Sequence, residues 1–291
     1  MIEAGLLLAL GCALLTNVAM LCKHRGANRA PDVRFSRPLR SAAELFRSRW
    51  WTIGFGVAFA AWGLHVAALA LAPLSLVQAV IAGGLVLLVV PAKHWFGITL
   101  GPRELTGIAL SAVGLAFLAL TATDGGAHSD YSQSAMISFE AGAVGIGVAL
   151  LLSHRHERVG PHGGLLLGAA GGLLIGVSDV AIKALADTVP AAPLSILSPW
   201  TLVAALSGLG AFYALARSLQ LGGAIDVIVI SSIAVNIAAI TGGVLVFGDP
   251  IGSNALAVVA RSAAFAAVIV AAALIPAVPR RASGEPQAQP A

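Results

Sequence analysis

Long apolar runs alternate with short polar breaks along most of the chain. The apolar runs predict nine helices, each long enough to cross a hydrocarbon core of roughly 30 Å. The breaks contain helix-ending residues, among them Ala72-Pro73, Ser198-Pro199 and Gly222-Gly223. We therefore expect an all-α polytopic membrane protein, with about nine transmembrane helices near residues 2–22, 51–72, 74–92, 104–122, 136–153, 163–187, 198–217, 224–247 and 253–277.

The composition excludes an ordinary soluble domain. Hydrophobic residues make up 58% of the chain and charged residues 10%, against roughly 25% charged residues in soluble domains. The mean hydropathy is +0.92. Cys12 and Cys22 lie in the same first apolar run, so the cysteines predict neither a disulfide framework nor a zinc site.

The basic residues gather in every second connection, which predicts the orientation because Lys and Arg collect on the cytoplasmic side. The connection around Asp124 and Asp130 is acidic instead. We expect the chain to be integral to the cell membrane, with its N-terminus outside and a disordered cytoplasmic tail at 281–291. The basic positions are Lys23, Arg25, Arg29, Arg34, Arg37, Arg40, Arg47 and Arg49, then Lys93 and Arg103, Arg155 and Arg158, Arg217, and Arg280 and Arg281.

The first connection contains the pattern of a helix start. Ser41-Ala-Ala-Glu44, followed by Leu45 and Phe46, matches a capping box that would open a short amphipathic helix on the inner membrane surface. The alternative is a disordered basic loop. Because the positive charge of this connection lies next to apolar helices, it favours anionic lipid and topology as the explanation for the basic pI of 9.6, and we do not expect nucleic acid as a partner.

Short matches in the same order indicate an internal repeat. Trp51-Thr52 opens the second predicted helix and Trp200-Thr201 the seventh, and Gly-Leu-Leu-Leu occurs from Gly5 and again from Gly164. The first four helices thus pair with the last four. Since five helices separate the partners, the two repeats would be inverted, as in many secondary transporters. We expect one transporter domain over 1–280, with repeat one at about 1–122, a linking helix at 136–153 and repeat two at about 163–278.

Three segments carry a resemblance to a known family. Ala70-Leu-Ala-Pro73-Leu-Ser-Leu-Val77 lies at the turn between the second and third helices, Ala181-Ile-Lys183-Ala-Leu185 in the sixth, and Ala216-Arg217-Ser-Leu219 at the end of the seventh. With these segments the chain resembles the drug/metabolite transporter superfamily, nearest its nine-helix branch of NIPA-type, magnesium-transporter-like proteins. The resemblance covers nearly the whole chain outside the tail and implies a secondary transporter.

The chain departs from that branch at one position. The branch places an acidic residue followed by Asn in the second helix, where this sequence has Trp62 and His65. The carboxylate that magnesium transport would use is therefore missing from the matching position.

Ionisable residues inside the predicted spans are the candidates for function, because a charge in hydrocarbon is costly. Asp179 and Lys183 in the sixth helix are spaced i, i+4 and predict an ion pair on one face. Asp179 is then either a proton or cation acceptor tuned by Lys183, or half of a structural pair; a third reading has Lys183 reach the outer surface. A four-residue stripe of glycines, Gly164, Gly168, Gly172 and Gly176, predicts that this helix lies in the interior.

Further polar residues of the spans complete the candidate path. His65, Glu140 and Arg261 fall in the outer half of their helices, where we expect them to line a vestibule with Asp179; alternatively Glu140 and Arg261 pair with each other or reach lipid headgroups. Asn236 lies near the middle of the eighth helix and is the best uncharged substrate contact. Asn17 and Gln78 are polar residues of the first and third helices.

The sequence contains no Walker A loop, His-Glu-x-x-His pair or Gly-x-Ser-x-Gly elbow. We expect no enzyme and no cofactor, and we leave a metal open. The predicted function is secondary transport of a small organic metabolite or drug-like compound; the alternatives are a magnesium or divalent-cation transporter and a non-transporting membrane scaffold. The expected partners are the bilayer, a small-molecule or cation substrate and, as an option, a second copy of the chain.

Overall fold

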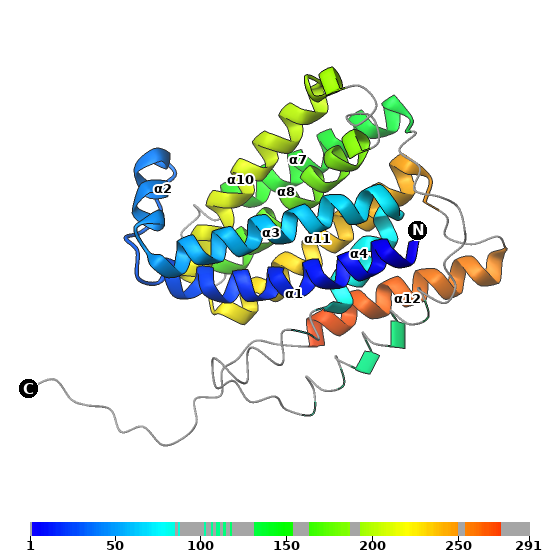
Figure 1. The fold of residues 1–291 in the computed structure, drawn as a ribbon, viewed down its shortest axis with the longest axis horizontal. Coiled ribbons are helices and arrows are strands. Elements are labelled where there is room, and N and C mark those ends of the chain that lie inside the picture. Colours follow the sequence, from blue (N-terminus) through cyan, green and yellow to red (C-terminus); the bar gives the residue numbers. More distant parts are fainter. Residues whose placement is uncertain are drawn as a thin grey trace, which may run out of the picture.

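The fold is a bundle of long apolar helices, seen in a computed structural model (Figure 1). The structure describes residues 2–84, 131–153, 163–186, 193–249 and 254–274, together with single positions between 87 and 117. The described residues form helices and contain no strand. The elements are α1 (Ile2–Ala27), α2 (Pro38–Phe46), α3 (Arg49–Leu71), α4 (Leu74–Gly83), α7 (Gln133–Ser153), α8 (Gly163–Ala186), the short 3₁₀ helix η3 (Pro193–Ile196), α10 (Pro199–Leu221), α11 (Ala224–Phe247) and α12 (Ala255–Leu274).

Six helices of the described part are long and apolar enough to span a membrane: α1, α3, α7, α8, α10, and α11 from Ile230 to Phe247. The chain is therefore a polytopic helical membrane protein. α12 lies where the ninth span was predicted, with a shorter apolar run at Ala255–Ala267. Most of the predicted span at 104–122 and most of 84–92 fall outside the described residues.

The turn formers end helices where the sequence predicts. α3 stops before the extended Ala72, and Pro199 begins α10, as its fixed φ favours. Gly248 closes α11 in the left-handed conformation at φ 66°, which suits a residue without Cβ. Two ends differ from the prediction. α1 continues past 22 and α10 past 217, so Lys23, Arg25 and Arg217 lie inside helices rather than in connections.

The extension of α1 has a physical reason. Cationic side chains are favourable in the last turns of a helix. Lys23 and Arg25 also contact aromatic rings of α3. The Lys23 ammonium lies 5.8 Å from the centre of the Phe55 ring, and the Arg25 guanidinium 4.4 Å from that of Trp50.

The amphipathic helix of the first connection is present, but its predicted start is wrong. α2 begins at Pro38, three residues before Ser41. The Ser41 hydroxyl accepts a hydrogen bond from the Arg34 N–H at 3.0 Å, and Glu44 pairs with Arg40 at 2.9 Å, so neither side chain forms a capping box. The proline explains the earlier start, because it is favoured in the first turn of a helix. α2 lies across the end of the bundle where α1 ends and α3 begins (Figure 1).

Helix α8 lies in the interior, as its glycines predict. It packs against one helix that runs antiparallel to it and one that runs parallel to it. Gly164 lies against Leu221 and Gly222, and Gly171 against Leu215, so α10 runs antiparallel to α8. Gly168 lies against Ile230 and Gly176 against Ala238, so α11 runs parallel to it. A Cβ at any of these glycines would meet a neighbouring helix at close range, which is why the stripe allows such packing.

The first helices are arranged in a similar way. α1 packs antiparallel to α3, with Gly5 against Ala72 and Gly11 against Leu64. Gly84, just past the end of α4, lies against Ala13 of α1. α3 also contacts α8, α1 contacts α10, and α4 contacts α11. α7 lies against α8 and α11, and α12 against α4 and α11.

Candidate functional site

All eight polar residues that the sequence singles out are buried, at most 7% exposed. Apolar side chains on the same helices are exposed instead, such as Leu7, Phe59 and Ile53 at 70%, 66% and 53%. The helices therefore direct their polar residues inward and their apolar ones toward lipid. The eight are Asn17, His65, Gln78, Glu140, Asp179, Lys183, Asn236 and Arg261.

Asp179 is the centre of a polar cluster formed by three helices, which we call the Asp179 cluster: His65, Gln78, Asp179 and Lys183. The Gln78 amide of α4 donates a hydrogen bond to Asp179 Oδ2 at 2.7 Å. His65 Nε2 of α3 lies 3.0 Å from Asp179 Oδ1, although neither ring nitrogen makes a well-aligned hydrogen bond. A carboxylate thus lies beside an imidazole in a site shielded from water.

Lys183 lies one turn further along α8 and is fully buried. Its ammonium donates to Leu69 O at 2.7 Å and to Ala72 O at 3.5 Å. These carbonyls belong to the last turn of α3, where backbone acceptors lack partners within the helix and a cation is favourable. Lys183 therefore caps α3.

The contacts of Lys183 differ from those that two of the sequence readings predict. The ion pairs of the described residues include Asp179 with His65 but not Asp179 with Lys183. The side chain also does not extend to the outer surface, since none of it is exposed. Residues spaced i, i+4 share one helix face, but here the two side chains turn to different partners on neighbouring helices.

Asn17 links the first helix to the end of α4. Its amide donates to Gly84 O at 2.9 Å. On the same helix, Cys12 Sγ lies 3.8 Å from Thr16 Oγ1, and α1 packs against α3 and α4, which carry His65 and Gln78. The cysteines form no disulfide: Cys12 and Cys22 are both free and buried. α1 therefore borders the Asp179 cluster.

The remaining candidates do not share these contacts. The Asn236 amide donates to Ser232 O at 2.7 Å within α11 itself, and its carbonyl oxygen has no hydrogen-bond partner in the described part of the chain. Glu140 lies on the buried face of α7 with Met136, Ala143 and Gly147, and neither carboxylate oxygen is hydrogen-bonded there. The pairing of Glu140 with Arg261, which the sequence offered as an alternative, is not among the ion pairs of the described residues.

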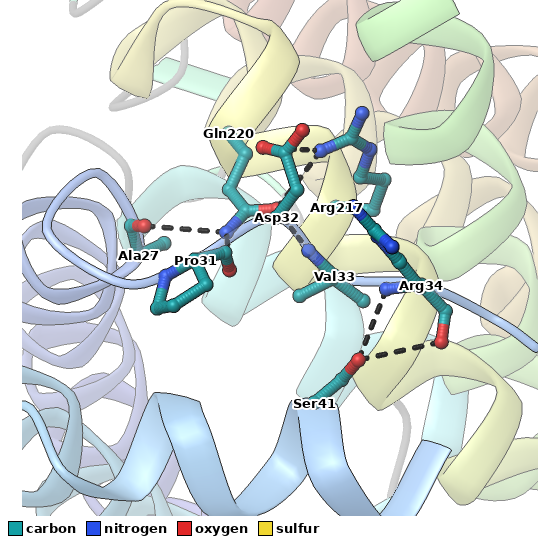
Figure 2. Close-up of polar contacts among 8 residues, drawn as sticks. All are labelled: Ala27, Pro31, Asp32, Val33, Arg34, Ser41, Arg217 and Gln220. Carbon is teal, nitrogen blue, oxygen red and sulfur yellow. Dashed lines mark hydrogen bonds and ion pairs between the residues drawn. The ribbon is translucent and has the colours of Figure 1, made fainter. Parts of the chain in front are cut away.

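Sequence reasoning missed a second polar network, at the other end of the bundle (Figure 2). Gln220 of α10 accepts from Val33 N–H at 2.8 Å and donates to Pro31 O at 3.0 Å and Ala27 O at 3.3 Å. Arg217 pairs with Asp32 at 2.9 Å. The signal in the sequence was slight. It consisted of Asp32, one of two acids in a basic connection, and of Gln220, the one glutamine at the end of an apolar run.

No group of three or more His, Cys, Asp or Glu side chains among the described residues is placed to share a metal ion. The Asp179 cluster contains one carboxylate, one imidazole, one amide and one ammonium. These groups together offer hydrogen-bond donors and acceptors to a polar ligand.

The chain matches no known family model, no curated protein and no solved structure.

Proposed function

We propose that this protein is a secondary transporter that works by alternating access between two inverted halves, with Asp179 as the coupling residue. The proposal includes nine spans, an outside N-terminus and a location in the cell membrane. The observation that carries it is the Asp179 cluster. Its carboxylate comes from α8 in the second half, whereas its partners His65 and Gln78 come from α3 and α4 in the first.

Such a position suits coupling. A charge buried in a span is costly unless it is paired, so a change in the protonation of Asp179 or His65 changes the free energy of their contact. Because that contact joins the two halves, the protonation state biases their relative arrangement. A ligand acts on a conformational equilibrium only through such a difference between the two states.

The helix contacts support the inverted repeat. α1 with α3 corresponds to α8 with α10, and both pairs are antiparallel. Between the halves, the contact of α3 with α8 corresponds to that of α10 with α1. Gly5 and Gly164 occupy matching positions in the two repeats, and their surroundings also match. Gly5 lies against the end of α3, and Gly164 lies against the end of α10.

The chemistry of the cluster favours an organic or zwitterionic substrate over magnesium. Mg²⁺ prefers an all-oxygen shell with carboxylates and retained waters. Here a single carboxylate lies beside an imidazole, with a lysine ammonium one turn away. The resemblance to the drug/metabolite transporters agrees with an organic substrate, while its magnesium-transporter-like branch remains the alternative.

Transport is tested with purified protein in proteoliposomes that contain a pH-sensitive dye. The panel comprises neutral amino acids, nucleosides, ethidium as an organic cation, and Mg²⁺. We expect one organic class to be accumulated when a proton gradient is imposed. Asp179→Asn should abolish driven accumulation but leave counterflow exchange, because Asn keeps the size and removes the titration. Glu3→Gln, which removes an exposed acid in the first turn of α1, is the matched control and should transport normally.

Two results would contradict the proposal. Driven accumulation by Asp179→Asn at the wild-type rate would remove the coupling role from this residue. If folded wild-type protein moves nothing in the panel, a non-transporting scaffold becomes the better account. The observation that favours a scaffold is that Lys183 and Asn17 bond to backbone carbonyls of neighbouring helices, as structural contacts do.

A further inference from the structure

The connection between α1 and α2 is held in place from both sides. Gln220 of α10 bonds to three backbone groups of this connection, as described above, and the side chain of Val33 is buried. On the α2 side, the Ser41 hydroxyl bonds to both N–H and C=O of Arg34, at 3.0 and 3.3 Å. Because the backbone at Arg34 is held, the surface around it is organised before any ligand arrives (Figure 2).

A small cavity of about 160 Å³ opens at this position. Arg34, Arg37 and Arg40 line it, with Ser41 and the acids Asp32 and Glu44. Each acid already has a cation: Asp32 pairs with Arg217 and Glu44 with Arg40. Within the described part of the chain, Arg34 and Arg37 have no acidic partner. The cavity therefore presents two exposed arginines whose charge is not balanced by its own acids.

The position of the cavity points to the lipid surface. α2 lies across the bundle axis at the ends of the spanning helices, which is the orientation of a helix in the plane of the membrane (Figure 1). Between the cavity residues Arg37 and Arg40, Leu39 is 84% exposed. An exposed leucine beside uncompensated arginines suits a site where acyl chains meet headgroups.

We propose that Arg34 and Arg37 bind the phosphate of an anionic phospholipid headgroup in this cavity. The guanidinium fork matches phosphate oxygens two at a time, which makes arginine more suitable than a point charge for this contact. The proposal depends on the membrane embedding of the chain and does not depend on transport.

The test measures lipid binding by the full-length protein in neutral detergent. Bound phosphatidylglycerol and phosphatidylcholine are counted by native mass spectrometry as each lipid is titrated. We expect phosphatidylglycerol to bind more tightly. Arg34→Gln with Arg37→Gln should weaken its binding roughly 30-fold, at about fivefold for each arginine near an anionic lipid. Folding should be unaffected, because the contacts that hold the connection use the Arg34 backbone and not its side chain.

The matched control removes the same charge outside the cavity. Arg29 and Arg47 are also exposed residues near this connection, and neither lines the cavity. Arg29→Gln with Arg47→Gln should weaken binding by less than about threefold, as screened charges outside a site do. An equal loss in the two double variants would show diffuse attraction and overturn the site. Displacement of phosphatidylglycerol by an equal concentration of inorganic phosphate would assign the cavity to a free anion instead.

Discussion

Lys183 and Asp179 are neighbours on one helix face, yet each has a separate set of contacts. The carboxylate joins α8 to α3 and α4, and the ammonium satisfies carbonyls at the end of α3. A buried ammonium that donates to backbone carbonyls is less costly than one without hydrogen-bond acceptors. At the scale of single residues, Lys183 therefore has a structural contact at the end of α3, and the coupling role that we propose for Asp179 does not depend on it.

This division predicts how the two residues combine in a double-mutant cycle. Lys183→Met should destabilise the protein by about 1–3 kcal/mol, because it leaves buried carbonyls of α3 without a donor. The loss is measured as thermal unfolding in detergent. Asp179→Asn should not rescue Lys183→Met if the lysine caps α3, and the two effects should be close to additive.

Lys183→Gln is the control, since it keeps a hydrogen-bond donor and removes the charge. We expect it to unfold closer to wild type than Lys183→Met does. Full rescue of Lys183→Met by Asp179→Asn would instead indicate that the two residues form the structural ion pair that their spacing predicts.

At the scale of elements, the glycine stripe explains why α8 has neighbours on two sides. Gly172 lies against the backbone of Ser231, and Gly176 against Ala238, so α11 approaches α8 more closely than larger side chains would allow. On α10 the glycines differ in their surroundings. Gly208 has no neighbouring atom within 4 Å of the position a Cβ would take. The same residue type thus has a packing role in one helix and none in another.

This contrast predicts that a Gly→Ala substitution has opposite effects on stability at the two positions. A Cβ at Gly172 would lie only 2.8 Å from Ser231 Cα. Gly172→Ala should therefore destabilise the protein despite the better helix propensity of alanine, since overpacking costs about 1–3 kcal/mol. Gly208→Ala should be neutral or stabilising by up to about 1 kcal/mol. Melting temperatures in detergent measure both, and equal values would show that the contact of α8 with α11 is not tight.

At the scale of the whole molecule, the ends of the helices sort into two groups. One end of the bundle, which α2 lies across, contains the end of α1, the start of α3, the end of α10 and the start of α8 (Figure 1). The end of α3, the start of α4 and the end of α8 meet at the other. This alternation agrees with the placement of the basic residues that the structure describes, most of which lie at the end that carries α2.

The orientation in the membrane is predicted from those charges and tested with two cysteines. Leu194 in η3 is 81% exposed, and Ser36 is exposed before α2. In a background with Cys12 and Cys22 replaced by alanine, Leu194→Cys should react with an impermeant reagent added to intact cells. Ser36→Cys should react only after permeabilisation, because positive loops stay inside.

If Ser36→Cys reacts in intact cells and Leu194→Cys only after permeabilisation, the orientation is the reverse of the predicted one. The two positions would still lie on opposite sides of the membrane. Labelling of both positions from the same side would contradict the arrangement of the spans.

The sequence alone determined the turn between α3 and α4, the start of α10 at Pro199 and the interior position of α8. Apolar runs, prolines and glycines affect the backbone within a few residues of their own positions. The break at Ala72-Pro73 and the glycine stripe of α8 could therefore be predicted from the sequence. The spacing of Asp179 and Lys183 was readable too, but their contacts were not. Only the tertiary structure decided that Asp179 bonds to Gln78, 101 residues away, and that Lys183 caps a helix 114 residues away. These pairings depend on how helices cross in space, and no local spacing encodes that geometry.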